Sequence, residues 1–374
     1  MSKKQTTPIF KLSKLKKSSI SSLLALLVFA IYQFLSDEKQ VIAPSHNQEI
    51  AYTTPASIPV TSDTIQFYSN QTEDDLTQLY LSTIQNAKQS ITFSIYSLMN
   101  PEVIQAINQK VDEGISVHIV CDAKASVGIS RKIPKASIVK RISAGLMHQK
   151  ILIVDKEKIL LGSANMTTDS LNVHGNLVFA FEHPSLGQAL FEKTLSMDEE
   201  GNSKKLMHCQ AQLGQQNLEL WILPDDQQAV NRILQLIQSA KKTIKVAMFT
   251  WTRSDLTQEL IQAAKRGVKV EVVIDRYSGK GASAKVVNSL ANAGIPIRLS
   301  IGQGLLHHKF AYIDEDTLIN GSANWTQSAF KVNDDCFVVL TSLLPQQKMK
   351  MNQLWIAINK KSEKVSINKK KGQK

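Results

Sequence analysis

The stretch HHKFAYIDEDTLINGSANWT, residues 307–326, sets a histidine, a lysine, an aspartate and a Gly-Ser-x-Asn turn at fixed intervals. An earlier stretch, HQKILIVDKEKILLGSANMT at residues 148–167, carries the same residue types at the same intervals. In both, apolar runs such as FAYI and ILIV flank a short polar turn, which is typical of paired strands. One copy is a weak signal for a site, whereas two copies in one chain require a common explanation.

A second pair of segments shows that the chain is duplicated. Residues 88–122 and 241–275 align without a gap, and each reads as a strand, a helix, a glycine and a second strand. Asn100 is expected to cap the first helix and Ser254 the second. Strand, helix and strand in this order are typical of a parallel α/β unit. We therefore predict an α/β fold of two pseudo-twofold related halves, with the functional site between them.

The chain of 374 residues is long enough for this arrangement and for terminal extensions. Residues 41–64 are rich in Pro, Ser and Thr and are expected to form a linker. The predicted division is a basic N-terminal tail with an anchor or signal at 1–40, the linker, a first half at 65–205, a second half at 206–358, and a basic tail at 359–374.

The net charge of +12 lies at the two ends of the chain. Residues 1–17 hold six lysines and no acid, and residues 360–374 hold seven lysines and one glutamate, so the remainder is close to neutral. Such tails are either solvated or attracted to anionic lipid head groups. This distribution argues mildly against a nucleic-acid-binding body, although a locally basic groove is compatible with it.

The uncharged run Ser18–Ser36 follows the first lysine-rich segment. It is just long enough to span a bilayer of roughly 30 Å at about 1.5 Å per residue. A secretory signal peptide has the same layout, but no small-x-small cleavage site follows Phe34, which favours an uncleaved anchor over a signal or a buried core helix. With the lysines in the cytoplasm, the rest of the chain would be membrane-anchored or secreted, and extracytoplasmic.

The repeated motif suits a phosphate group. Histidine and lysine two positions apart project from the same side of a strand, and the Gly-Ser turn directs its serine and asparagine toward the same point. Lysine and asparagine offer donors for phosphate oxygens. The predicted phosphate-binding residues are Lys150, Lys309, Asn165, Asn324, Ser163 and Ser322. The three cysteines are widely spaced and no His, Cys or carboxylate cluster suggests a metal, so we expect no metal and no cofactor, with lysines supplying the positive charge.

Displacement at phosphorus benefits from two imidazoles, one that attacks and one that protonates the leaving oxygen. His148 and His307 supply both if the two halves face each other. Asp155 and Asp314 sit at the far end of their strands and are expected to make structural hydrogen bonds. His308 points to the opposite face from its neighbour and is expected to be structural. Trp251 and Trp325 either pack in the core or line a substrate entrance.

The pattern HxKx4Dx6GSxN, present twice, resembles the phospholipase D superfamily over roughly residues 65–358. Similar members include bacterial phospholipases D, endonucleases that dimerise to join two single motifs, and mitochondrial cardiolipin hydrolases. The resemblance implies a duplicated α/β/α sandwich and metal-independent cleavage through a phosphohistidine, with His148 attacking and His307 acting as the acid and later the base. It also implies that Asp335 orients His148 and that Asn176, which brings no charge, orients His307.

The resemblance leaves the substrate open. A membrane-bound phospholipase D that hydrolyses or transfers a phosphatidyl group accounts for the apolar segment and the lysine tails. An endonuclease that cleaves DNA or RNA accounts for the total charge, and a cardiolipin synthase-like transferase is a further lipid option. A non-enzymatic phosphate binder would not need both imidazoles. Because both motifs lie in one chain, a catalytic dimer is not required.

Overall fold

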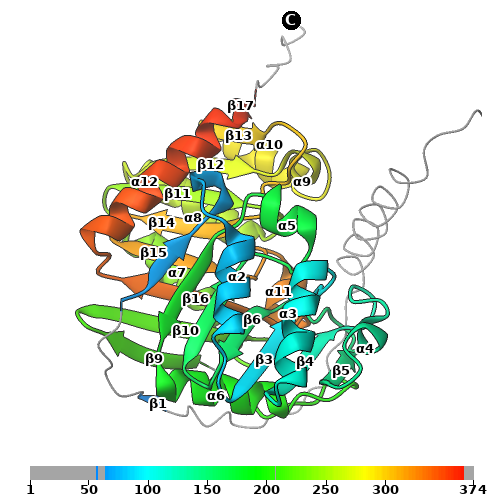
Figure 1. Cartoon of the computed structure of the whole chain (residues 1–374). Helices are drawn as coiled ribbons and strands as arrows, with labels where there is room; N and C mark the ends of the chain where they lie inside the picture. Colours follow the sequence, from blue (N-terminus) through cyan, green and yellow to red (C-terminus); the bar gives the residue numbers. More distant parts are fainter. Residues whose placement is uncertain (1–55, 58–63, 207, 366–374) are drawn as a thin grey trace, which may run out of the picture. The chain divides into compact units, whose positions relative to one another are not determined.

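The computed structural model describes residues 56–57, 64–206 and 208–365, all within one compact unit, Ser45–Lys374 (Figure 1). The predicted anchor, most of the predicted linker and the end of the basic tail lie outside the described residues. Within the described ranges, no helix has the length and apolar character needed to cross a bilayer.

The first half is built around a seven-stranded sheet with the order β2-β8-β7-β6-β3-β4-β5. Strands β3, β4 and β5 are parallel, and β6 returns antiparallel to β3. Its elements are β2 (Gln66–Tyr68), η1 (Asn70–Thr72), α2 (Leu76–Gln85), β3 (Ser90–Ile95), α3 (Pro101–Asp112), β4 (Ser116–Asp122), α4 (Ile129–Lys132), β5 (Ser137–Arg141), β6 (Lys150–Val154), β7 (Lys158–Gly162), α5 (Thr168–Asn172), β8 (Val178–Glu182) and α6 (Pro184–Leu195).

The second half repeats this strand order as β10-β16-β15-β14-β11-β12-β13, within a ten-stranded sheet that adds β9 and β1 at one edge and β17 at the other. Its elements are β9 (His208–Leu213), β10 (Gln216–Leu223), α7 (Ala229–Ser239), β11 (Thr243–Met248), α8 (Ser254–Lys265), β12 (Lys269–Ile274), α9 (Arg276–Lys280), α10 (Ala284–Asn292), β13 (Ile297–Ser300), β14 (Lys309–Ile313), β15 (Thr317–Gly321), α11 (Gln327–Lys331), β16 (Asp335–Thr341), α12 (Pro345–Lys360) and β17 (Ser362–Lys364), with β1 at Ala56–Ser57.

The two predicted helix starts have different outcomes. Asn100 caps α3, because its side chain accepts a hydrogen bond from the Val103 N–H at 3.0 Å. Ser254, predicted to cap the second helix, is instead the first residue of α8, and Arg253 occupies the cap position without a side-chain cap bond. A good capping residue therefore marked the helix start to within one position.

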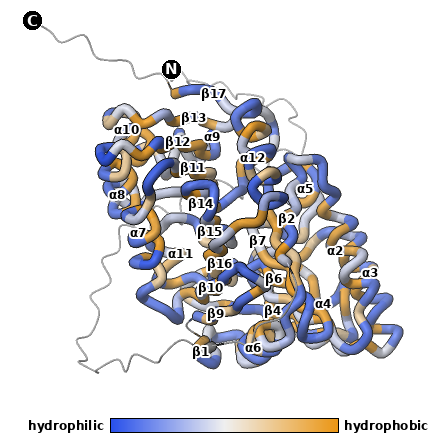
Figure 2. Tube along the Cα trace, turned by 90° about the vertical axis from the view of Figure 1, so that its left-hand side faces the viewer, coloured by the Kyte–Doolittle hydropathy of each residue, from blue (hydrophilic) through white to orange (hydrophobic). Residues whose placement is uncertain are grey.

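Alternation along the strands builds three apolar layers. In β14, Phe310 and Tyr312 point into the core between the two sheets, whereas Ala311 and Ile313 point toward the second half's own helices. The core between the sheets also takes in α6 and α12, so each sheet has helices on both faces (Figure 2). The predicted duplicated α/β/α sandwich is confirmed.

The ends of the folded part differ from the predicted boundaries. Residues 359–364, assigned to the basic tail, complete α12 and form β17, which pairs antiparallel with β13. Within the predicted linker, Ala56–Ser57 forms β1 and pairs with β9. Lysine-rich sequence and Pro, Ser and Thr content indicated solvated segments, but edge strands need little hydrophobic side-chain burial because backbone hydrogen bonds hold them.

Candidate active site

The two motif histidines lie where the halves meet, each held by the backbone of the other half. The His148 N–H donates to the carbonyl of Asp334 at 2.8 Å, and the His307 N–H donates to the carbonyl of Gly175 at 2.9 Å. Short parallel bridges continue this exchange, from Met147 to Asp334 and from Gly175 to Leu306. Both imidazoles therefore sit at one pseudo-twofold interface.

Two glycines that the sequence prediction missed allow this close approach. A Cβ atom on Gly145 would lie 2.2 Å from the carbonyl oxygen of Val332, and one on Gly304 would lie 2.4 Å from that of Val173. Gly145 and Gly304 each stand three residues before a motif histidine, 159 positions apart like the motifs themselves. Extending the repeat comparison upstream of the histidines would have found them.

His148 is oriented by a carboxylate from the second half. Its Nδ1 lies 2.8 Å from Asp335 Oδ1, which also accepts the Ser322 hydroxyl at 2.5 Å. Because a carboxylate only accepts hydrogen bonds when ionised, His148 carries its proton on Nδ1 and presents a free Nε2 lone pair. Both side chains are buried, so the contact is shielded from water.

His307 is oriented by an amide from the first half. Its Nδ1 lies 3.0 Å from Asn176 Oδ1, which also accepts the Ser163 hydroxyl at 2.8 Å. Asn176 Nδ2 donates to the carbonyls of Ser170 and His174, so the orientation of the amide is fixed. The result is the same geometry as at His148 without the negative charge.

Ser163 and Ser322 were predicted to contact phosphate, but the structure turns their hydroxyls away from the imidazoles. Both are fully buried, and their hydroxyls donate to Asn176 and Asp335 rather than facing the space beside the imidazoles. Each serine also accepts a backbone N–H from the next strand, of Leu177 or of Cys336. This arrangement favours a supporting role, in which the serine fixes the residue that orients the histidine.

The two lysines begin β6 and β14 and lie beside the histidines. Lys150 Nζ donates to the carbonyl of His148 at 2.5 Å, and Lys309 Nζ donates to that of His307 at 2.8 Å. Burial lowers the pKa of Lys150 to about 7 and holds the pKa of Lys309 well below its ordinary value, where the nearby Lys150 charge adds to the effect. An incoming phosphate would favour the charged form of both amines.

The histidines and lysines act electrostatically as one group. Burial lowers the pKa of His148 to about 4, with Asp335 raising it and the ammonium groups of Lys150 and Lys309 lowering it. Burial, Lys309 and Lys150 hold the pKa of His307 well below its ordinary value. Lysines of both halves thus influence each imidazole, and two neutral imidazoles face a region of positive potential that suits a phosphodiester anion.

The motif asparagines, Asn165 and Asn324, occupy equivalent positions in the two halves but differ in their hydrogen bonds. Asn324 Oδ1 accepts the Thr250 N–H at 3.3 Å, while Asn165 Oδ1 is buried without a hydrogen-bond partner among the described residues.

The motif aspartates lie at the far turn, as the sequence suggested for a structural pair. Asp155 and Asp314 each accept three backbone N–H groups, from residues 88–90 and 241–243.

Three aromatic neighbours of the site were missed by the sequence prediction. Tyr96 lies 5.3 Å from the His148 ring and Phe249 lies 5.0 Å from the His307 ring, and each also sits below the motif lysine of its half. They occupy equivalent positions 153 residues apart. His174 lies 6.5 Å from His307 in a position that the second half fills with asparagine.

The remaining predictions concern residues outside the reacting group. Trp251 and Trp325 are buried against each other with ring centroids 4.6 Å apart, so they pack in the core rather than lining an entrance. His308 is buried and contacts Gln71 through Nε2 at 2.7 Å, on the side opposite His307. Both observations agree with packing roles.

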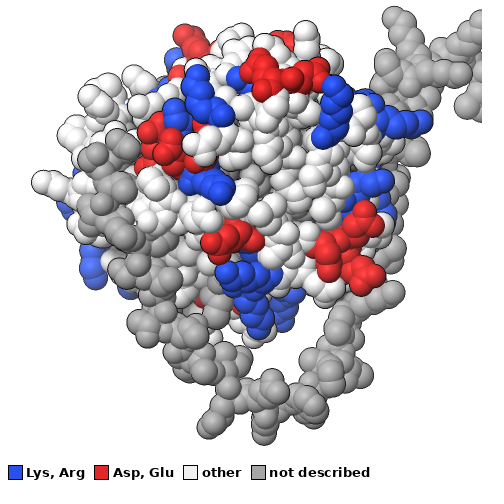
Figure 3. Space-filling model, turned by 60° about the horizontal axis from the view of Figure 1, so that its bottom comes forward, with Lys and Arg blue, Asp and Glu red and all other residues white. Residues whose placement is uncertain are grey.

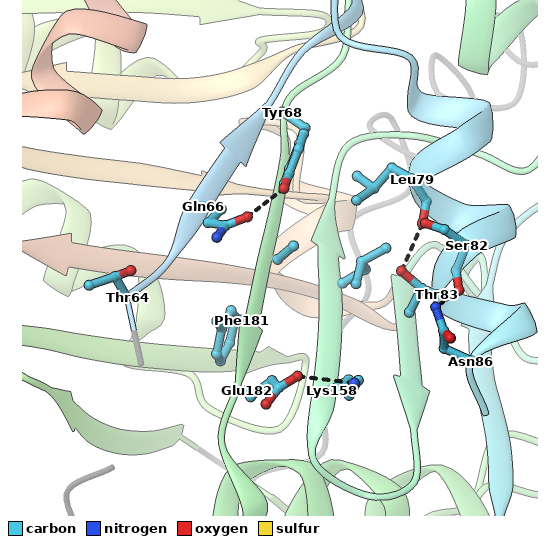
Figure 4. A pocket seen from close by; sticks show the side chains of 12 residues that line it. Thr64, Gln66, Tyr68, Leu79, Ser82, Thr83, Asn86, Lys158, Phe181 and Glu182 are labelled. Carbon is cyan, nitrogen blue, oxygen red and sulfur yellow. Dashed lines mark hydrogen bonds and ion pairs between the residues drawn. The ribbon is translucent and has the colours of Figure 1, made fainter. Parts of the chain in front are cut away.

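A pocket of about 450 Å³ lies on the first half, between edge strand β2 and α2, away from the histidines (Figure 4). Its charged side chains, Lys158 and Glu182, form an ion pair at 3.2 Å, and Tyr68 is hydrogen-bonded to Gln66. Because these polar groups already satisfy one another and none of the predicted site residues lines the pocket, the interface between the halves remains the candidate site.

Comparison with known proteins places both halves in one family. Residues 80–196 and 233–355 match the family model described as cardiolipin synthase, PLD-like domain. The chain is 30% identical over 129 residues to a mitochondrial cardiolipin hydrolase of Chlamydomonas reinhardtii, 34% over 112 residues to that of Homo sapiens, and 33% over 108 residues to a phospholipase D of Rickettsia prowazekii. These matches cover 34%, 30% and 29% of this chain, and 57%, 44% and 52% of the relatives.

A solved structure extends the similarity across both halves. Phosphatidylserine synthase of Haemophilus influenzae superposes with a TM-score of 0.61, covering 80% of this chain and 87% of its own, at 13% identity. At that identity the likeness concerns the fold alone. Together with the family match over both repeats, it shows that this chain belongs to the phospholipase D superfamily.

Proposed function

We propose that the protein is a phospholipase D-type phosphodiesterase that hydrolyses or transfers the phosphatidyl group of a phospholipid without a metal ion. The observation that carries this proposal is the reciprocal orientation of His148 by Asp335 and of His307 by Asn176 at one interface. Relatives named cardiolipin hydrolase and phospholipase D support a lipid substrate.

The proposed reaction has two displacements at phosphorus. The bound phosphodiester anion favours the protonated form of His307, so that its Nε2 carries a proton. His148 Nε2 attacks the phosphorus atom, the bond from phosphorus to the alcohol oxygen breaks, and His307 donates its Nε2 proton to that oxygen. In the second step a water molecule or an acceptor alcohol attacks, His307 takes its proton, and the bond from phosphorus to His148 breaks. Lys150 and Lys309 stabilise the charge that builds on the oxygens between these groups.

A side-by-side assay tests the reaction and its substrate. The purified full-length chain is offered phosphatidylcholine, cardiolipin and single-stranded DNA, each with and without a chelator. We expect cleavage of a lipid that persists in chelator. Cleavage of DNA alone would establish the endonuclease alternative, and loss of all activity in chelator would contradict the metal-free mechanism. An acceptor alcohol in the same assay distinguishes hydrolysis from a synthase-like transfer.

The roles of the two histidines are tested by trapping the intermediate. His148→Ala should form no phosphoenzyme, because the attacking nitrogen is absent. His307→Ala should accumulate one with a substrate whose leaving group needs no proton, because the second step lacks its base. Acid quench and mass spectrometry detect the adduct, and the reverse pattern would exchange the two assignments.

The face drawn in Figure 3 gives the nuclease alternative no support from its charges. On the face drawn in Figure 3, basic and acidic side chains lie beside one another in small groups rather than forming a continuous basic surface. A nuclease that follows a polyanion needs several adjacent phosphate contacts. The predicted membrane anchor and extracytoplasmic location remain part of the proposal, since Ser18–Ser36 lies outside the described residues.

A further inference from the structure

Exposed aliphatic side chains recur at equivalent positions in the two halves. Ile142 and Ile301 are 67% and 43% exposed, and Val173 and Val332 are 53% and 44% exposed. Both pairs are 159 positions apart, the same offset as the motif histidines. Since exposed aliphatic surface is unfavourable in water, the repetition of exposure at two independent sites indicates a surface with a partner. We call these four residues the aliphatic rim.

The aliphatic rim lies at the edge of the sheets where the histidines meet. Ile142 and Ile301 directly follow β5 and β13, which run parallel to β3 and β11. The motif lysines pair with the carboxyl ends of those strands, Lys150 with Ile95 and Lys309 with Met248. The rim isoleucines and the motif lysines therefore belong to the same edge of the molecule.

The rim valines connect to the site more directly. Val173 and Val332 each stand three residues before the residue that orients a histidine, Asn176 or Asp335. Their carbonyls lie against Gly304 and Gly145, in the segments that lead into the histidines of the opposite half. Each half thus places one valine beside the other half's motif, so the rim flanks the site on both sides.

Lysines accompany the rim. Lys140, Lys331, Lys360 and Lys361 are exposed, lie close in sequence or structure to rim residues, and form no ion pair within the described residues. The Ile301 N–H donates to the carbonyl of Lys361, and a groove of about 530 Å³ there is lined by Val173, Ile301, Leu305, Lys360 and Lys361. Acidic residues are also present nearby, Asp169 in α5 and Glu199, whose carbonyl accepts the Ile142 N–H.

We propose that the aliphatic rim inserts into the surface of a phospholipid bilayer and presents the site to a lipid that remains in the membrane. This inference rests on the proposed function, because it assumes a lipid phosphodiester as substrate. Aliphatic side chains gain by entering hydrocarbon, and unpaired lysines suit the phosphate layer above it. A nucleic acid offers no hydrocarbon to these side chains, so the rim favours a bilayer over a polyanion.

Tryptophan substitution tests where the rim lies. Ile142→Trp is compared with Met349→Trp, a position on α12 that is 59% exposed against 67% for Ile142. Both variants are full-length protein reconstituted into vesicles of phosphatidylcholine with a brominated fraction. The native tryptophans, Trp221, Trp251, Trp325 and Trp355, are all buried. We expect brominated lipid to quench the rim tryptophan and not the one at position 349. Equal quenching of the two variants, or quenching of neither, would overturn the proposal.

The control position is well separated from the site. α12 follows β16, which starts at the site with Asp335 and ends at the opposite edge, so Met349 near the beginning of α12 lies on the far side. Met349 resembles the rim residues in its exposure and size but does not lie at the edge that carries the histidines. A tether elsewhere in the chain would affect both variants alike, so the difference between them reports on the rim.

A turnover ratio tests what the rim does. In the double variant Ile142→Ser with Ile301→Ser, turnover of vesicle lipid divided by turnover of soluble bis(p-nitrophenyl) phosphate should fall about tenfold, because two partly inserted side chains are lost. An unchanged ratio would refute the rim's role. If turnover of single-stranded DNA falls instead, the surface binds nucleic acid. If the parent chain cleaves neither phosphodiester, the proposed function fails, whatever the quenching experiment shows.

Discussion

The two motif histidines look equivalent in the sequence, but their partners differ in charge. Asp335 is ionised, since contact with His148 outweighs the effect of burial and holds the pKa of the carboxyl below its ordinary value. Asn176 orients the His307 ring in the same way but carries no charge. A carboxylate makes an imidazole a better nucleophile and stabilises it once it carries positive charge, which favours His148 as the attacking residue.

Replacing Asp335 by asparagine tests this asymmetry. The Asp335→Asn variant should lose about 100-fold or more in kcat, because the amide can orient the ring, as Asn176 does at His307, but cannot stabilise positive charge on His148. Turnover of a soluble phosphodiester measures the loss, and a thermal melt close to that of the parent shows that the fold survives. A kcat within twofold of the parent would mean that orientation alone suffices at both histidines.

The buried histidine and lysine predict the pH dependence of catalysis. In the proposed reaction His148 must be neutral to attack, and its lowered pKa of about 4 keeps it neutral until the pH falls to that value. Lys150 must be charged to bind phosphate, and its pKa of about 7 means that charge is lost above neutrality. The acid limb of kcat/KM, which reports the free enzyme, should therefore lie near pH 4, and activity should be declining by about pH 7, where Lys150 loses its charge. An acid limb near pH 6.5 would show an ordinary, solvated histidine.

The site residues that could be predicted from the sequence were polar residues that recur at the same spacing in both halves. Histidine, lysine and asparagine recurred at fixed spacing, so both motifs could be located before the fold was known. Tyr96 and Phe249 recur at equivalent positions too, but as a tyrosine and a phenylalanine within apolar strands they resemble core residues. The serine roles could not be predicted, because a hydroxyl at a turn faces either way and only the neighbouring strand decides.

At the scale of elements, the motif aspartates join each hairpin to the start of a neighbouring strand. Asp314 takes up a left-handed backbone with φ of 52° and accepts N–H groups from residues 241–243, where β11 begins. Asp155 repeats this arrangement at β3. An aspartate tolerates this backbone conformation better than most residues and supplies two acceptor oxygens, which explains its place in the motif.

Asp314→Asn should therefore destabilise the protein by about 1–3 kcal/mol, because charged acceptors are replaced by an amide. Burial would raise the pKa of Asp314, but the three N–H donors outweigh it and hold the pKa below its ordinary value. The stabilisation is thus present above the unfolded pKa and is lost as the pH falls through the folded pKa. The difference in urea midpoint between variant and parent should shrink in acid.

Asp112→Asn is the matched control for that substitution. Asp112 is an exposed carboxylate paired with Lys135 on the surface, so its loss should change stability by less than about 0.5 kcal/mol. Equal effects at positions 112 and 314 would show that the turn contacts contribute little.

The elements themselves were predictable where local signals agreed, as at α3, whose Asn-Pro start and apolar face point to the same helix. They were less predictable where tertiary pairing decides. β17 contains Ser362 and Lys364 and has no strand-like sequence, yet it forms because β13 offers an unpaired edge. Composition alone cannot show such an edge, since it exists only once the sheet is assembled.

At the scale of the whole molecule, the two halves are related by pseudo-twofold symmetry, but one ion pair across their interface breaks that symmetry. Arg141 at the end of β5 binds both carboxylate oxygens of Asp334 from the second half, at 2.8 and 2.9 Å, and donates to carbonyls of residues 198, 201 and 202. Both side chains are buried. The equivalent positions hold Ser300 and Gly175, so this ion pair occurs on one side of the pseudo-twofold axis only. Its partner Asp334 also accepts the His148 N–H and precedes Asp335.

Removing one partner of this pair should cost about 3–5 kcal/mol, because the other is left buried and unpaired. Arg141→Ser leaves the carboxylate of Asp334 without its cation, and the double variant with Asp334→Gly copies the arrangement of the other side. We expect the double variant to be more stable than Arg141→Ser alone by urea denaturation, since it no longer buries a lone charge.

Lys135→Ser, which breaks an exposed ion pair with Asp112, is the control and should have a stability near that of the parent. If Arg141→Ser is no less stable than Lys135→Ser, the interface is held by its apolar core and backbone bridges, and the ion pair serves only to place the segment that carries Asp335.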